Sequence, residues 1–195
     1  MCFLKQKFFS RKLPAFSIVE ALFSMVILTV GLLSTTLIVA KSLSYSFDTR
    51  DTIIGIQLAQ EGAELIRNSR DNDFLLGNEG FTQFSNSKHC RASYDDDPET
   101  TLNCNSSQGD ASQYSLVQSG GFYKHTGEPG GFSRYIYVDL QNVASDPSAH
   151  VLSFVYWGWT SEGFPSFIPN NGDPSECTLQ NKCVYTESYL TSWKN

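Results

Sequence analysis

One carboxylate, Glu20, lies near the start of an otherwise uncharged apolar run of 25 residues, at positions 16–40. A run of this length can cross a lipid bilayer as a single helix. A carboxylate at the centre of such a helix costs roughly 2.5–3.5 kcal/mol, and less near the helix end, where Glu20 lies. An acid retained at this cost indicates a function, and it raises the question of which positive group it meets.

A short basic segment precedes the apolar run. It carries Lys5, Lys7, Arg11 and Lys12 and no acidic residue. Positive charge before a span holds that side in the cytoplasm, so we expect everything after residue 40 to lie outside. Secretory signal peptides also begin with basic residues, but their apolar region is only about 7–15 residues long and ends at a small-residue cleavage site. A plain signal anchor explains the length and orientation of the run but not its acid.

Residues 14–20 read PAFSIVE, followed by ALFSMVILTVGLL. This segment resembles the processing motif of type IV prepilins. The resemblance implies that a prepilin peptidase cuts between Ala15 and Phe16, before the apolar run, and that the new amine of Phe16 is then N-methylated. Glu20 matches the acidic position of the family, the fifth residue after the cut. The family usually has Gly before the cut, and this chain has Ala15, another small residue.

A cut before the span would leave the apolar helix attached, so the product would stay in the inner membrane until it is assembled. In the core of a filament, Glu20 would then pair with the Phe16 ammonium of a neighbouring subunit and set the register between subunits. The residues also fit a local role for the acid. Ser17 and Glu20 have the spacing of a capping box, and the positive end of a helix dipole favours a carboxylate there. The two roles are compatible.

Helical periodicity continues beyond the span. Five apolar residues share one helical face: Leu43, Phe47, Ile54, Leu58 and Leu65. No Pro occurs between Phe16 and Asn72, so nothing breaks the helix before that point. The first strong stop signal is Asn72-Asp73 followed by Gly77. We therefore predict one helix over residues 16–72, with a transmembrane part at 16–40 and an amphipathic continuation, 41–74, that packs on a head domain.

The rest of the chain, residues 75–195, has the pattern of a β-rich head. Four strands are predicted, at 114–117, 134–140, 151–160 and 184–190, with turns rich in Gly and Pro between them. Short strands without intervening helices favour an antiparallel sheet, and the apolar helix face would cover one side of it. The polar stretch 77–111 is interpreted as a surface excursion. The expected fold class is thus α+β, with a leader peptide at 1–15.

The chain has five cysteines, and Cys2 would leave with the leader. The remaining four can pair in three ways, and an even number in an outward-facing domain favours disulfides. Cys90–Cys104 and Cys177–Cys183 close the shortest loops and are the favoured pairs. A metal site that uses His89 is the alternative, but no C-x-x-C pair supports it.

Other features point away from catalysis and from nucleic acid. The chain has a net charge of −6, and the leader carries four of its positive charges, so the processed chain is more acidic still and unsuited to binding nucleic acid broadly. The acidic stretch at 95–99 lacks the spacing of a calcium loop, and aromatics at strand period, such as Trp157 and Trp159, more often fill a core than bind a ligand. No catalytic motif is present, so we expect neither an enzyme nor a cofactor.

We therefore predict a structural subunit of a type IV pilus or related filament. Residues 58–74 and 186–193 resemble minor pilins, the latter those of the pilus-modification type, which favours a minor subunit. The expected partners are prepilin peptidase and other pilin subunits; the expected locations are the inner membrane, with the head outside, and then a cell-surface filament. Two alternatives stay open: a pseudopilin of type II secretion, and a signal-anchored binding module that never assembles and would tolerate Glu20→Ala.

Overall fold

The structure is a computed structural model, and it describes residues 17–78, 80–84, 88–93, 102–125, 128, 130–141, 147–158 and 169–192. The chain divides into two compact units, Met1–Phe47 and Asp48–Asn195. One helix, α1 (Ile18–Leu75), contributes to both units. Among its described residues, the second unit adds seven strands and four short 3-10 helices. The strands are β1 (His89–Ala92), β2 (Leu102–Asn105), β3 (Ser115–Ser119), β4 (Phe122–His125), β5 (Phe132–Gln141), β6 (Ser148–Trp157) and β7 (Cys183–Thr191). The predicted α+β class is confirmed.

Helix α1 begins directly after Ser17, whose carbonyl oxygen accepts a hydrogen bond of 3.2 Å from the Ala21 amide. It ends three residues beyond the predicted stop at Asn72. The chain then turns at Gly77, which has a φ of 87°, a conformation that glycine adopts without steric cost. The helix has 58 residues and no Pro, as the sequence indicated.

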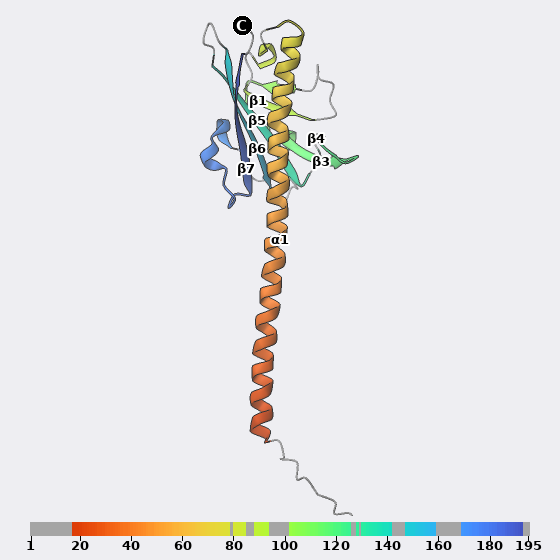
Figure 1. Cartoon of the computed structure of the whole chain (residues 1–195), viewed down its shortest axis with the longest axis vertical. Helices are drawn as coiled ribbons and strands as arrows, with labels where there is room; N and C mark the ends of the chain where they lie inside the picture. The colour runs from red at the N-terminus through yellow and green to blue at the C-terminus, as the bar shows by residue number, and fades with distance from the viewer. Residues whose placement is uncertain are drawn as a thin grey trace, which may run out of the picture. The chain divides into compact units, whose positions relative to one another are not determined.

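The seven strands form one antiparallel sheet, which lies against the part of α1 in the second unit (Figure 1). Strand β5 pairs with β6 along its whole length on one side. On its other side it pairs with β1 through Ile136 and Tyr137 and with β3 through Phe132 and Ser133. Strand β7 pairs with the outer side of β6, and β2 and β4 pair with β1 and β3. All four predicted strands are present, as β3, β5, β6 and β7.

The interpretation of residues 77–111 as a surface excursion was wrong for the part that the structure describes. This stretch supplies β1 and β2, and Cys90 and Ala92 of β1 are completely buried beside Phe81 and Phe84. Few of its residues are apolar, but these four lie in the same buried cluster as Ile66 of α1. The short strands gave no run long enough for a periodic pattern to be recognised.

The sheet is covered on both faces. Helix α1 covers one face, where Leu58, Ala59 and Ile66 pack on residues of β5 and β6. The other face holds an aromatic cluster that includes Tyr135, Phe154 and the Cys177–Cys183 disulfide. Because both faces are buried, β6 is enclosed almost along its whole length. This explains why its sequence is nearly continuous in apolar residues rather than alternating.

The buried face of α1 differs from the predicted one. Leu58 is buried as expected, and Ile54 and Leu65 pack partly against the core, but Leu43 and Phe47 are exposed. The centre of the contact is made largely of small residues: Gly55, Ala59, Gly62 and Ala63. A search for large apolar side chains cannot find such a face, because its role is to let the helix backbone approach the sheet.

Candidate functional site

The first candidate site is the N-terminal part of α1. Between Ile18 and Lys41 its one charged residue is Glu20, in the first turn. The helix is long and apolar enough to cross a membrane, and its most apolar window has no buried residue. Its large side chains, such as Phe23, Leu28 and Ile38, are 58–80% exposed. An apolar surface of this size needs lipid or another protein around it.

The hydroxyl groups of this segment are satisfied within the helix itself. Ser24 donates to the Glu20 carbonyl at 2.8 Å, and Ser34 donates to the Val30 carbonyl at 2.8 Å. Thr29, Thr35 and Thr36 each donate to the carbonyl three residues before them. These groups therefore do not require water, which suits a helix surrounded by lipid or by other helices.

The structure places only some of the predicted site residues. Ala15 and Phe16 lie outside the described residues, so the predicted cleavage and methylation positions stay predictions. Glu20 is on the exposed first turn, directly after the helix start at Ser17 that the capping-box spacing indicated. The acidic stretch 95–99 and Trp159 also lie outside the described residues.

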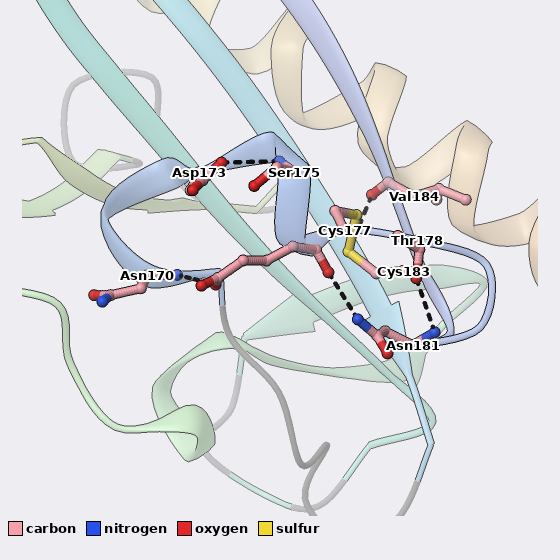
Figure 2. The surroundings of a disulfide bond; sticks show 9 residues. Asn170, Asp173, Ser175, Cys177, Thr178, Asn181, Cys183 and Val184 are labelled. Atoms are coloured by element: carbon pink, nitrogen blue, oxygen red, sulfur yellow. Dashed lines mark hydrogen bonds between the residues drawn. A yellow bond between two sulfur atoms is a disulfide. The ribbon is translucent and has the colours of Figure 1, made fainter.

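Both favoured disulfides are present. Cys90 and Cys104 are directly opposite each other on β1 and β2. Cys177 and Cys183 join a 3-10 turn to the start of β7 (Figure 2). Polar groups hold the turn before this disulfide and join it to the closed loop: Asp173 accepts from the Ser175 amide at 2.9 Å, and the Asn181 side chain, inside the loop, donates to the Glu176 carbonyl at 2.9 Å. In the described part of the chain, no cluster of three or more His, Cys, Asp or Glu could hold a metal ion.

An ion pair between a buried arginine and a half-buried glutamate joins α1 to the sheet, and sequence reasoning missed it. Arg134, on β5, is completely buried, and its Nη1 atom lies 3.0 Å from the Oε1 atom of Glu61 on α1. The same guanidinium donates to the Leu58 carbonyl at 3.2 Å and to the Ala92 carbonyl at 2.5 Å. It therefore holds α1, β1 and β5 together. Burial lowers the pKa of Arg134, and Glu61 opposes that shift.

Gly62 makes room for this guanidinium. A Cβ atom at Gly62 would collide with the Ser153 hydroxyl and would lie 2.8 Å from Cδ of Arg134. The other charged residues of this part of α1 pair within the helix: Glu64 pairs with Arg67, at 2.5 Å, and Arg70 pairs with Asp71, at 2.8 Å. Glu61 instead reaches the sheet. In the sequence, the one feature that could have indicated this contact is the Glu61-Gly62 dipeptide, an acid beside a glycine inside a helix.

Two histidines lie inside the head. His89 is buried, with its Nδ1 atom 2.7 Å from the Tyr135 hydroxyl. His125, on β4, has its Nδ1 atom 3.2 Å from the Ser115 carbonyl, and its amide donates to the Ser93 hydroxyl at 3.1 Å. Burial, and then the charge of Arg134, lowers the pKa of His125 to about 3. His125 therefore stays neutral in the folded head at physiological pH.

The lowered pKa of His125 predicts that the folded head is less stable in mild acid than at neutral pH. The folded-state pKa lies below the unfolded value of about 6.5, so below pH 6.5 the unfolded chain binds a proton that the folded head does not. Between pH 7 and pH 5 we expect the free energy of unfolding to fall by about 1–2 kcal/mol, less than the full shift implies because the side chain is only partly buried. The measurement is urea unfolding at both pH values.

The matched variant is His125→Gln, which cannot titrate in this range. His89 also has a lowered pKa and acts in the same direction, so the variant will keep part of the acid sensitivity. An equal loss in the parent and in the variant would show that His125 does not contribute.

The comparisons with known proteins give no relative: no family model, no curated protein and no solved structure matches this chain.

Proposed function

We propose that this chain is a structural subunit, of the minor class, of a type IV pilus or related filament. The observation that carries the proposal is the position of Glu20. It lies on the first turn of an exposed helix whose next 20 residues carry no charge. The antiparallel sheet under the second half of α1 is the head that such a subunit requires.

The proposed mechanism begins in the inner membrane, with the basic leader in the cytoplasm. Prepilin peptidase cuts between Ala15 and Phe16, and the Phe16 amine is methylated. The processed helix then leaves the lipid and packs among the helices of other subunits. There Glu20 pairs with the terminal ammonium of a neighbour, and this pair selects the register in which the helices pack.

The head would contribute rigidity to this arrangement. Two disulfides and the Glu61–Arg134 pair hold α1, the sheet and the C-terminal loop together. Such a head can tolerate the loss of lipid around its helix without unfolding. A pseudopilus of type II secretion would use the same features. A signal-anchored binding module would need the apolar helix as an anchor but would give Glu20 no role.

The N-terminus of the membrane-extracted protein tests the proposal. In a host with a prepilin peptidase and a type IV pilus machine, we expect intact mass and N-terminal sequencing to give a chain that begins at N-methyl-Phe16. A chain that keeps Met1, or one cut after residue 40, would contradict the proposal and would favour the anchored or secreted module.

Glu20→Gln separates processing from assembly. This variant should be cut and retained in the membrane, but its amount in the sheared filament fraction should fall at least tenfold. Asp48→Asn is the matched control, because Asp48 is an exposed acid of the same helix outside the apolar run. Equal recovery of both variants in filaments would mean that Glu20 has no role in assembly.

A further inference from the structure

Strand β7 has one edge that pairs with β6 and one that faces outward. The Trp157 amide donates to the Lys182 carbonyl at 3.0 Å, and the Ser192 amide donates to the Pro147 carbonyl at 3.1 Å. The antiparallel register continues these hydrogen-bonded pairs with β6 at every second residue of β7: Val184, Thr186, Ser188 and Leu190. Hydrogen-bonding residues alternate along an antiparallel strand. The odd-numbered residues of β7 therefore direct their amides and carbonyls away from β6.

The two ends of this outward edge are already bonded. The Cys183 amide donates to the Thr178 carbonyl at 3.0 Å, within the disulfide loop of Figure 2. At the other end, the Thr191 carbonyl accepts from Nη1 of Arg70 at 3.1 Å. Between these ends lie Tyr185, Glu187 and Tyr189, and no residue in the described part of the chain pairs with their outward backbone groups. This open stretch is long enough to add another strand.

The side chains along the open stretch are exposed and contact one another and β6. Tyr189 is 68% exposed, and its ring stacks on that of His150 at 4.5 Å between centroids. The Glu187 carboxylate accepts from Nε2 of His150 at 2.6 Å and from the Tyr189 hydroxyl at 2.9 Å. Strand β7 contains no Lys and no Pro, the residues that commonly protect a strand edge from pairing. Glu187 is its one charged residue.

We propose that the outer edge of β7 binds an extended segment of another polypeptide, which places a Lys or Arg opposite Glu187. The backbone groups of Tyr185, Glu187 and Tyr189 would supply the hydrogen bonds, as in other cases of strand addition. β-Branched or aromatic residues of the partner would pack beside the two tyrosines. The inference does not depend on assembly into a filament.

Charge argues against a second copy of this chain as the partner. A symmetric antiparallel pair that uses all three open residues would set Glu187 directly opposite Glu187 of the other copy. Like charges in that position are destabilising, whereas an opposite charge stabilises the pair. The same carboxylate thus disfavours self-pairing and selects a basic partner, which is how edge strands combine attraction with exclusion.

Amide hydrogen exchange, followed by NMR on the full chain in non-ionic detergent, tests this inference. The probe is a nine-residue peptide of alternating threonine and valine with lysine at its centre; the matched probe has glutamate there. In the free protein we expect fast exchange at Tyr185, Glu187 and Tyr189 and slow exchange at Thr186 and Ser188. Millimolar lysine peptide should slow the first three at least tenfold, and the glutamate peptide should not.

Glu187→Lys should reverse the preference between the two peptides without changing exchange at Thr186 and Ser188. Slow exchange at the three amides in the free protein would overturn the proposal, because the edge would already be paired. Protection that increases with protein concentration alone would also overturn it and would identify a second copy as the partner. Protection by neither peptide would overturn the proposal that this edge adds a strand. Equal protection by both peptides would contradict the role of Glu187.

Discussion

Glu61→Ala is expected to destabilise the head by about 3–5 kcal/mol, the range measured when one partner of a buried ion pair is removed. The reason is that Arg134 stays behind, completely buried and with only two carbonyl oxygens as acceptors among the described residues. An arginine does not escape this cost by losing its proton, because its pKa is too high. Urea unfolding of the full chain in detergent, followed by tryptophan fluorescence, measures the loss, since Trp157 is buried between α1 and the sheet.

Glu64→Ala is the matched control. Glu64 lies three residues further along α1 and pairs with Arg67, but the two side chains are 61% and 42% exposed, so water reaches both charges. Exposed pairs contribute only about 0–1 kcal/mol, so this variant should be nearly as stable as the parent. Equal losses for Glu61→Ala and Glu64→Ala would show that the Arg134 pair is not the link between helix and sheet.

The two sides of the buried pair are not equivalent. Arg134→Met removes the buried charge and leaves Glu61, whose side chain is 35% exposed and can be solvated. We therefore expect Arg134→Met to cost less than Glu61→Ala, and the double variant to resemble Arg134→Met alone. A double variant as unstable as the sum of the two single variants would contradict this account, because residues in one ion pair should not act independently.

The overall architecture could be predicted from local signals. The absence of Pro and the helical period indicated one long helix, which the structure has as α1. Apolar alternation indicated β5, apolar residues on a single strand face indicated β6, and turns rich in Gly and Pro separated these segments from β3 and β7. Short loops favoured the two disulfide pairs that are present. In each case the pattern was contained within a short segment of chain.

What the sequence did not reveal depends on contacts between distant segments. Strands β1 and β2 have four residues each, too few for a periodic signal, and they exist because β5 and a disulfide hold them. Arg134 reads as an ordinary polar residue at a strand start, because its burial is decided by α1. The small-residue face of α1 was missed for a related reason: glycine and alanine carry no apolar signal of their own.

The candidate functional features also include one that the sequence reveals and others that depend on contacts elsewhere. Glu20 stands out in the sequence because an acid in an apolar run is unusual in any fold, and the structure leaves it exposed on the helix. Its proposed partner, the amine of a neighbouring subunit, belongs to another chain. The open edge of β7 became visible only when the strand pairing was known, since the sequence of an edge strand and that of a central one can be the same.

Gly62→Leu is expected to destabilise the head by about 3 kcal/mol, at the upper end of the range for overpacked cores. A glycine inside a helix costs about 1 kcal/mol relative to alanine, so its presence here needs a compensating benefit. The benefit is space: a Cβ atom would collide with the Ser153 hydroxyl and crowd Arg134 and Ile136. A larger side chain must therefore push α1 away from the sheet and stretch the Glu61–Arg134 pair.

Gln60→Leu is the matched control, because it adds the same side chain on the exposed side of the same helix turn. It should leave the free energy of unfolding, measured in urea, within about 0.5 kcal/mol of the parent, as surface substitutions usually do. Gly62→Ala should fall between the two, since better helix propensity offsets part of the collision. If Gly62→Leu were as stable as Gln60→Leu, the helix could not rest on the sheet at this residue. The Glu61–Arg134 pair depends on that close approach and would then not link the helix to the sheet.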